Sequence, residues 1–473
     1  MALRIVWFNQ ILRVSDHPAL VAAARKGQVL PVFILDPERS DGRLDPLAGG
    51  AKRWWLHGAL HELGDELAVL GSPLIIRSGP TVETLATLCR EAGASGIDLT
   101  RPFDPLGRDR LSALRSRLSG VDLQAHAGAT LFLPSELRNA SGQAFQVFTP
   151  FWKALRALGD PSLPLPAPAA LDRPSVTVTG LGMDELGLTP RHPDWAGGLR
   201  RTWTPGSRAG RARLAAFLAD GLSRYATDRD YPARDGTSEL SPYLASGELS
   251  VREAWHAVRD VQRARGVSDD AAEAWLRQLA WREFAWHLLD AHPHTLFQPL
   301  RPQYAAFPWR DDPESFAAWT RGETGYPLVD AGMRQLWETG WMPNRVRMVV
   351  ASFLVKHLLI PWQQGARWFE DTLVDADLAS NVFGWQWVAG SGADGAPYFR
   401  VFNPLAQAKT FDPDGAYIAR WIPELAALPP ALRHQPWPPG VELGAVETYP
   451  RPIIEHAWAR NRALQAFAEM KES

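Results

Sequence analysis

The chain has 473 residues, of which 46% are hydrophobic and 22% charged, and its formal net charge at pH 7 is −2. This composition is typical of an ordered globular protein, and the single cysteine, Cys89, excludes a disulfide framework and a cysteine metal cluster. No run of about 18 apolar residues predicts a membrane span, so we expect a cytoplasmic protein. Because the overall charge is slightly negative, any DNA binding has to come from a local basic surface.

Strand-like and helix-like segments alternate along the first 130 residues. Apolar runs at 4–8, 29–35, 74–77 and 95–99 predict strands, and amphipathic stretches at 18–26, 51–70, 81–92 and 107–118 predict helices. This alternation predicts a doubly wound, Rossmann-like parallel sheet with helices on both faces. Ligands of such sheets lie at the carboxyl ends of the strands, here the loops 7–16, 36–43 and 100–109. No GxGxxG follows the first strand, so a dinucleotide site of the usual kind is not expected.

The remainder of the chain is predicted to be a linker followed by helices. Proline and glycine accumulate in residues 131–200, where only 148–158 predicts a helix. Beyond residue 201 strand signals are absent, and helices are predicted at 206–221, 250–265, 269–291, 313–320, 326–339, 345–359 and 365–373. We therefore expect an α/β domain over 1–130, a linker over 131–200 and an all-α domain over 201–473.

Residues 324–404 combine large aromatic side chains with charged ones. A buried charge needs a partner and stacked rings favour another ring, so this mixture predicts a bound polar aromatic molecule. Ordinary aromatic core packing is the alternative. The residues concerned are Trp337, Trp341, Trp362, Trp368, Trp385, Trp387, Arg345, Arg347, Asp375, Asp377 and Asn381.

A second candidate site is the turn at residues 237–241. Thr237, Ser238 and Ser241 place consecutive hydroxyls ahead of a helix start, an arrangement suited to a diphosphate, although a plain N-cap is the alternative. His57 and His61 have the spacing of metal ligands on a helix, but no third ligand lies near them in sequence, so no metal site is predicted.

Five segments together resemble the flavin-binding motifs of the DNA photolyase/cryptochrome family. They are GTSELSPYLASGELS, WLRQLAWREFAWHLL, TGYPLVDAGMRQL, GWMPNRVRMVVASFLVKHLL and DADLASNVFGWQWVAGSGADGAPYFRVFNP. The resemblance is closest to microbial class I photolyases that split cyclobutane pyrimidine dimers, and it extends over nearly the whole chain. It implies light-driven repair of damaged DNA by an electron from reduced FAD. It also implies the division into an α/β domain, a linker and a helical FAD-binding domain.

The resemblance implies a set of residues that hold a U-shaped FAD. Those expected around the diphosphate are Tyr225, Thr237, Ser238, Glu239, Leu240, Ser241 and Arg282. Those expected around the isoalloxazine and ribose are Asn344, Arg347, Asp375, Asp377 and Asn381. Asn381 matches the position that faces flavin N5, and Asp375 is expected to pair with Arg347.

The resemblance also implies an electron path and a substrate pocket. Trp309, Trp362 and Trp385 match a chain of three tryptophans that leads from the surface to the flavin. A flipped-out dimer would stack between Trp281 and Trp387. The other residues expected to contact the substrate are Gln278, Arg345, Met348 and Gln407.

Departures from the family pattern leave alternatives open. Gln278 stands where dimer photolyases usually have a glutamate, and Pro343 replaces a common histidine. Residues 8–18, FNQILRVSDHP, replace FRRDLRLxDxP in a loop that helps to form the family's antenna pocket, so an antenna can be absent. FDPLGRDR at 103–110 resembles the loop of members with a deazaflavin or flavin antenna, and Pro105 stands where folate-binding members have a glutamate, which favours a flavin-type antenna or none over a folate. A cryptochrome-like photoreceptor that keeps FAD is the alternative to a monomeric repair enzyme. The end of the chain soon after Ala466, without a long tail, favours the enzyme.

Overall fold

The structure is a computed structural model that describes residues 2–36, 49–265, 267–395, 399–437 and 448–472. The chain forms two compact units. Unit 1 consists of Met1–Ala196, Trp203–Leu222 and Ser238–Pro293, and unit 2 consists of Gly197–Thr202, Ser223–Thr237 and His294–Ser473. The helices at residues 241–291 thus belong to the same unit as the N-terminal residues. The domain boundaries expected at 130 and 200 stay predictions.

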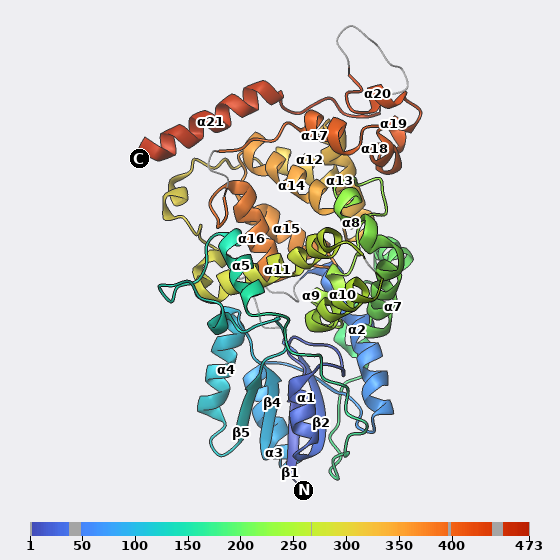
Figure 1. The fold of residues 1–473 in the computed structure, drawn as a ribbon, viewed down its shortest axis with the longest axis vertical. Helices are drawn as coiled ribbons and strands as arrows, with labels where there is room; N and C mark the ends of the chain where they lie inside the picture. Colours follow the sequence, from blue (N-terminus) through green and yellow to red (C-terminus); the bar gives the residue numbers. More distant parts are fainter. Residues whose placement is uncertain (1, 37–48, 266, 396–398, 438–447, 473) are drawn as a thin grey trace. The chain divides into compact units, whose positions relative to one another are not determined.

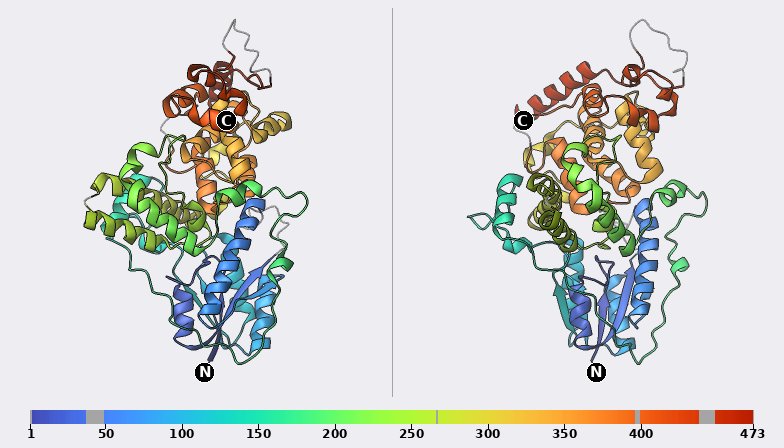
Figure 2. Two further views of the ribbon diagram at one scale, coloured as in Figure 1. Left: turned by 90° about the vertical axis from the view of Figure 1, so that its right-hand side faces the viewer. Right: turned by 45° about the vertical axis from the view of Figure 1, so that its right-hand side comes forward.

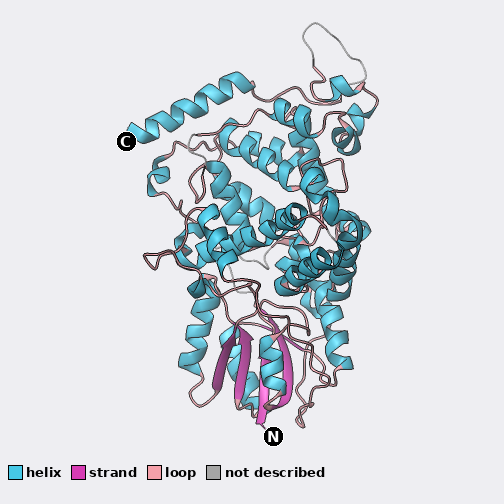
Figure 3. Cartoon of the chain, in the orientation of Figure 1, coloured by secondary structure: helices cyan, strands magenta, loops and turns pink. Residues whose placement is uncertain are grey.

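Unit 1 is built on a five-stranded parallel sheet with the strand order β3-β2-β1-β4-β5 (Figure 3). The strands are β1 Ala2–Trp7, β2 Gly27–Leu35, β3 Ile75–Ser78, β4 Gly96–Thr100 and β5 Asp122–His126. The helices between them are α1 Pro18–Ala24, α2 Gly50–Val69, α3 Thr81–Ala92 and α4 Pro105–Arg117. The predicted parallel α/β sheet is confirmed, and this strand order places β1 at the centre, as in Rossmann-like folds.

Alternate residues of the central strands make the core on one sheet face. Leu3, Ile5 and Trp7 of β1 pack with Leu85 of α3 and Leu114 of α4. Helix α1 is absent from this cluster and instead contacts β1, β2, β4 and β5, so helices cover both faces. The fifth strand was missed in the sequence because its DLQAH segment is polar and largely solvent-accessible, as edge strands often are.

The other described elements of unit 1 are helical (Figure 1). They are η1 Pro134–Glu136, α5 Phe148–Ala157, η2 Met183–Leu186, α7 Ser207–Ala216, the π-helical η3 Phe217–Gly221, α9 Ser241–Ala245, α10 Val251–Arg265 and α11 Asp269–Ala291. The predicted bounds of α11 are those observed, because Ser268 caps its first turn by accepting a hydrogen bond from the Ala271 N–H.

Unit 2 contains helices throughout its described part and no strand there (Figure 2). These are α6 Gly197–Thr202, α8 Leu222–Asp228, η4 Pro293–Leu296, η5 Pro302–Ala306, α12 Pro313–Arg321, α13 Pro327–Thr339, α14 Asn344–Ser352, the π-helical η6 Phe353–His357, α15 Trp362–Thr372, α16 Leu378–Ala389, α17 Pro404–Phe411, α18 Ala416–Trp421, α19 Pro423–Ala426, α20 Pro430–Arg433 and α21 His456–Glu472. The first residues of α8 and η4, Leu222 and Pro293, belong to unit 1. Among the described residues, no helix has the length and apolarity needed to cross a membrane.

Candidate functional site

The strongest ion pair among the predicted site residues joins α14 to the segment before α16. Nη1 and Nη2 of Arg347 lie 3.0 and 2.8 Å from Oδ1 and Oδ2 of Asp375, whose side chain is 3% exposed. Arg347 Nε also donates to the backbone carbonyl of Met342 at 2.8 Å. The expected pair is therefore present, and its two-pronged geometry fixes both side chains while neutralising the buried carboxylate.

The start of α16 positions two further predicted residues. The Asp377 carboxylate caps the helix by accepting a hydrogen bond from the Ser380 N–H at 2.8 Å. One turn later, Asn381 Nδ2 donates to the Ala366 carbonyl of α15 at 2.9 Å. This bond uses the amide nitrogen of Asn381 and so fixes the direction of its amide oxygen.

Trp385 lies where α15 and α16 pack closely. Its side chain is 2% exposed, and a Cβ added to Gly365 would lie 2.1 Å from the Trp385 ring, so only glycine allows this approach. Edge-on rings of Phe369 and Trp319 lie 5.0 and 6.2 Å from it. Trp385 Nε1 is buried and has no hydrogen-bond partner among the described residues. A buried indole N–H needs a hydrogen-bond acceptor, and the described part of the chain does not supply one.

The same face of α16 has unoccupied space. Asn381, Gly384 and Trp385 are spaced i, i+3 and i+4 and thus share one face of the helix. A Cβ added to Gly384 would meet no described atom within 4 Å. A directed amide, room beside the backbone and an unpaired indole N–H together fit a flat polar ligand.

The three tryptophans of the expected electron chain differ in exposure. Trp362 and Trp385 are each 2% exposed, whereas Trp309 is partly exposed and rests on Phe307 with ring centres 4.4 Å apart. This order, with the accessible ring at Trp309, is what a path from the surface to the interior requires.

The predicted substrate residues of unit 2 differ in whether their polar groups already have hydrogen-bond partners. Trp387 donates from Nε1 to the Asp394 carbonyl at 3.0 Å, and Asn344 Nδ2 lies 3.7 Å from the sulfur of Met348. Gln407 Oε1 is buried without a hydrogen-bond partner among the described residues. The amide of Gln407 therefore has capacity for a ligand, whereas the Trp387 indole is already held in place.

The diphosphate turn has a strained backbone. Glu239 has a φ of 48°, in the left-handed region that side chains rarely adopt, and Leu240 returns to the right-handed region. The Glu239 side chain forms an ion pair with Arg213. When a residue with a left-handed backbone conformation is followed by one with a right-handed conformation, both backbone N–H groups point to the same side. This arrangement forms a concave anion-binding site. Thr237 ends a segment of unit 2 and Ser238 begins one of unit 1.

Tyr225 is expected to close the diphosphate side from unit 2. Its side chain is 6% exposed, and burial raises the pKa of its hydroxyl to about 12. The guanidinium of Arg229 lies 5.2 Å from the centre of its ring. Tyr225 therefore stays neutral at physiological pH and acts only as a hydrogen-bonding group.

Helix α11 carries three predicted residues in unit 1. Gln278 donates to the Ala274 carbonyl at 3.0 Å, and Arg282 donates from Nη1 to the Ala129 carbonyl at 3.0 Å. Arg282 Nε is buried and lacks a partner among the described residues. Trp281 stacks on Phe148 with ring centres 3.5 Å apart and an interplanar angle of 9°. One face of the Trp281 indole is thus already covered, which the sequence did not indicate.

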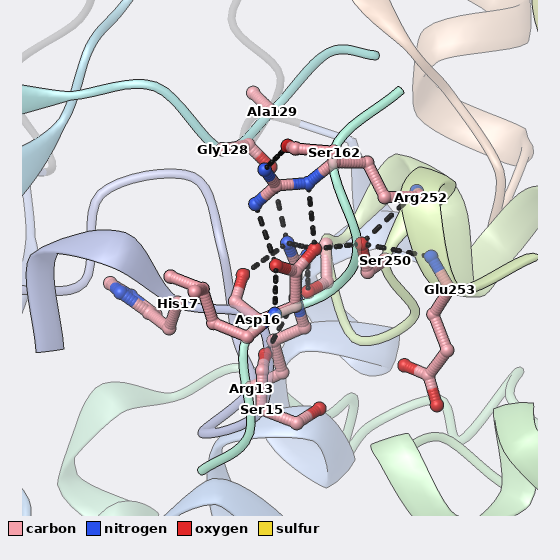
Figure 4. Close-up of polar contacts among 12 residues, drawn as sticks. Arg13, Ser15, Asp16, His17, Gly128, Ala129, Ser162, Ser250, Arg252 and Glu253 are labelled. Carbon is pink, nitrogen blue, oxygen red and sulfur yellow. Dashed lines mark hydrogen bonds and ion pairs between the residues drawn. The ribbon is translucent and has the colours of Figure 1, made fainter. Parts of the chain in front are cut away.

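The buried Asp16 network was missed in the sequence (Figure 4). Asp16 accepts from Arg252 at 2.6 and 3.1 Å, from the Leu165 N–H at 2.9 Å and from the Ser250 hydroxyl. Arg13 donates to the Gly247 carbonyl at 2.8 Å. These bonds hold the segment that directly follows α9. In the sequence, Asp16 could have been noticed because it lies in the loop at the carboxyl end of the first strand.

The loops at the carboxyl ends of β1 and β4 are joined by amide side chains. Asn9 donates to the Thr100 carbonyl at 2.8 Å, and Gln10 donates to Asp104 Oδ2 at 3.1 Å. Asn9 and Gln10 therefore make polar contacts at the place where FRRDLRLxDxP chains have charged residues.

The histidine pair on α2 was weighed as a metal site. His57 and His61 have ring centres 5.1 Å apart. In the part of the chain that the structure describes, no three His, Cys, Asp or Glu side chains are grouped to hold a metal ion.

Comparisons with known proteins agree on the family. The model described as DNA photolyase matches residues 4–169, and the model for the FAD binding domain of DNA photolyase matches residues 275–469. A deoxyribodipyrimidine photo-lyase of Agrobacterium fabrum is 44% identical, with 99% of this chain and 98% of the relative covered. Cryptochrome-2 of Arabidopsis thaliana is 37% identical, with 99% of this chain and 79% of the relative covered.

A solved structure leads to the same assignment. It is described as a bacterial class III photolyase from Agrobacterium tumefaciens, has a TM-score of 0.94 at 44% identity, and covers 100% of this chain and 98% of its own. The chain belongs to the DNA photolyase/cryptochrome family and carries its FAD-binding domain. In unit 2, the unpaired Trp385 nitrogen and the space beside Gly384 fit such a cofactor.

Proposed function

We propose that this protein repairs cyclobutane pyrimidine dimers in DNA with the help of light. The observation that carries the proposal is the 44% identity, over 99% of the chain, to a deoxyribodipyrimidine photo-lyase. The class I resemblance is not supported at the level of subclass, because the structural neighbour of equal identity is described as a class III photolyase. We therefore assign the protein to the class III type.

The residues described above have distinct tasks in this reaction. FAD, when bound and reduced, supplies a light-activated electron for the dimer. The Arg347–Asp375 pair and Asn381 hold the polar edge of the isoalloxazine, and Asp377 and Asn344 complete its surroundings. The turn Ser238–Ser241 offers backbone N–H groups to the diphosphate, and Thr237, Tyr225 and Arg282 are the other residues proposed to bind it.

The tryptophan chain has the task of keeping the cofactor reduced. Trp309, Trp362 and Trp385 would conduct an electron from the surface to bound FAD in that order, and a reductant in solution would restore Trp309. Indole suits this task because its large ring is oxidised at lower cost than other side chains. The exposure order of the three rings supports the direction of the path.

The substrate is recognised by stacking and by hydrogen bonds. Trp387 and Trp281 stack on the extruded dimer, which is cheaper to flip than normal bases because it is poorly paired. Gln278 and Gln407 hydrogen-bond its polar edges, Met348 packs against it, and Arg345 binds a neighbouring phosphate. Gln278 carries no charge, unlike the glutamate of typical dimer photolyases, so it donates and accepts neutral hydrogen bonds.

A second chromophore of the flavin or deazaflavin type is also proposed. Asp36, which follows β2, accepts hydrogen bonds from the Thr81 hydroxyl at 2.8 Å and the Thr81 N–H at 3.1 Å, and it pairs with Arg110 of α4. These side chains lie at the strand ends where ligands of parallel sheets bind. A monomeric state and a cytoplasmic location stay predictions.

The test is restoration of thymine. The purified protein with chemically reduced FAD is mixed with an oligonucleotide carrying one thymine dimer and illuminated with blue light, and a dark sample serves as the control. Light-dependent recovery of intact thymines is expected.

A cryptochrome-like photoreceptor is the second candidate, favoured by the 37% identity to cryptochrome-2. Photoreduction of FAD with no recovery of thymine would establish that candidate instead.

A further inference from the structure

A surface cluster in unit 2 joins the segment after α8 to α14 and α17. We name it the Arg345 cluster. Its members are Arg229, Asp230, Tyr231, Arg234, Arg345 and Phe411.

Arg345 makes one ion pair and one ring contact. Its Nη2 lies 3.1 Å from Oδ2 of Asp230, and its guanidinium carbon lies 4.2 Å from the centre of the Phe411 ring. Its Nε is buried and has no hydrogen-bond partner among the described residues. A guanidinium presents a fork that matches two oxygens, so the contact through Nη2 leaves part of this fork unused.

Asp230 lies within reach of two guanidiniums. Besides Arg345, Nε of Arg229 lies 3.8 Å from Oδ1 of Asp230, and the Asp230 side chain is 36% exposed. Ion pairs with this much contact with water are weak and readily exchanged. A phosphodiester carries a full negative charge and two free oxygens, so it can engage the Arg345 fork more completely than Asp230 does.

Aromatic rings hold the arginines of the cluster at the surface. Tyr231 and Phe411 meet edge to face with ring centres 6.4 Å apart, and the Arg234 guanidinium carbon lies 4.1 Å from the centre of Tyr231. Guanidinium and aromatic groups thus alternate from Arg345 to Arg234. This alternation is typical of surfaces that bind nucleic-acid backbones.

We propose that Asp230 competes with DNA phosphates for Arg345. This inference rests on the proposed function, which places Arg345 against DNA. To bind a phosphate with both prongs of its fork, Arg345 has to exchange its pair with Asp230, and this exchange weakens binding to any DNA, damaged or undamaged. Asp230 thereby shortens the time spent on undamaged sites without altering the preference for a dimer, which depends on stacking and hydrogen bonds to the flipped bases.

The experiment compares DNA affinities of the full-length protein with bound FAD, in the dark. Anisotropy of a labelled duplex, with and without one thymine dimer, is measured from about 50 to about 200 mM salt. Asp230→Asn should bind both duplexes about three- to tenfold more tightly at low salt, with a salt slope steeper by about one. Asp230→Ser is a second variant without the carboxylate, and flavin absorbance reports folding.

The control is Asp260→Asn, which makes the same change of charge. Asp260 is 75% exposed and pairs with Arg263 on α10 in unit 1, outside the cluster. If the Asp230 and Asp260 variants gain affinity equally, net charge explains the result and the competition is refuted. Tighter binding to the damaged duplex alone would also refute it. If thymine is not restored under light while Asp230→Asn still tightens DNA binding, the competition stands and the repair proposal fails.

Discussion

Phe148 covers one face of Trp281, with the two ring planes 9° apart. The Trp281 ring, which is proposed to stack on a dimer, therefore has its orientation fixed by α5 before the dimer binds. Such pre-orientation lowers the cost of ordering the side chain on binding.

Phe148→Leu should weaken binding of dimer-containing DNA while leaving bound FAD unchanged. The substitution keeps an apolar side chain but removes the stack, whose contribution of about 0.5–1.5 kcal/mol corresponds to a loss of about two- to tenfold in affinity. Phe151→Leu is the matched control, since Phe151 is also 1% exposed on α5 and packs on Phe284, as Phe148 does. Equal losses in both variants, measured by anisotropy, would show that α5 packing rather than the stack matters.

Asp375→Asn should reduce both stability and FAD retention. It leaves the Arg347 guanidinium without a charged partner, and breaking a buried pair costs about 3–5 kcal/mol, with the lower end expected because Arg347 is 23% exposed. Urea unfolding and release of flavin fluorescence are the measurements. The double variant Arg347→Gln with Asp375→Asn should lose less than the two single losses combined. Additive losses would show that the two side chains do not act as a pair.

Gly365→Ala should displace the Trp385 indole. The added Cβ would lie 2.1 Å from that ring, so α15 and α16 have to separate. We expect lower FAD content and a cost of about 1–3 kcal/mol from overpacking. Gly64→Ala in α2 is the control because a Cβ there meets nothing within 4 Å, and it should be neutral or stabilising. Unchanged flavin content in Gly365→Ala would contradict this role of glycine.

Trp362→Phe should abolish photoreduction of oxidised FAD and spare repair by protein that was reduced beforehand. Phenylalanine keeps the packing of a 2% exposed site but is far harder to oxidise. Absorbance under blue light with a reductant present follows the first effect, and thymine recovery follows the second. Trp195→Phe, at a 45% exposed position in unit 1, should leave both unchanged. Photoreduction at the normal rate in Trp362→Phe would remove this residue from the electron path.

Acid should destabilise the protein through its buried histidines. Burial lowers the pKa of His17 and His357 to about 3 and that of His287 to about 4. Since these pKa values are depressed, their contribution to stability is present above pH of about 6.5 and is lost as pH falls towards the native values. Each histidine adds a slope of up to about 1.4 kcal/mol per pH unit.

His287→Phe tests this dependence. The ring of His287 packs against Phe151 at 5.2 Å, so a phenylalanine keeps the contact while removing the titrating group. Urea midpoints between pH of about 4 and about 6.5 should fall less steeply than in the unchanged protein. An identical pH slope would mean that His287 is protonated equally in both states.

Sequence patterns predicted the elements whose signals are local. Four strands and the bounds of α11 follow from apolar runs, helix periodicity and the Ser268 cap. The Arg347–Asp375 pair was expected from the resemblance to the photolyase/cryptochrome motifs, and in the structure it neutralises the buried Asp375 carboxylate. Helix α16 was not predicted, since LASNVFGWQWVA has no polar face, and only its Asp377 cap marks its start.

Contacts between residues distant in sequence escaped prediction. Trp281 and Phe148 are separated by 133 positions, and Arg345 and Asp230 by 115. No local period or motif encodes which aromatic ring covers Trp281 or which carboxylate reaches Arg345. The aromatic and charged residue types indicated a site in residues 324–404, but their partners are fixed by tertiary packing.

The Asp16 network limits how parts of this protein can be exchanged with relatives. Because Asp16 receives hydrogen bonds from Ser250 and Arg252, a chimera that imports only the N-terminal α/β segment has to keep an aspartate at this position, as chains with the pattern FRRDLRLxDxP do. A parent whose loop lacks this aspartate would leave Arg252 without its carboxylate. A recombination border that carries residues 13–16 and 247–252 from the same parent avoids this conflict.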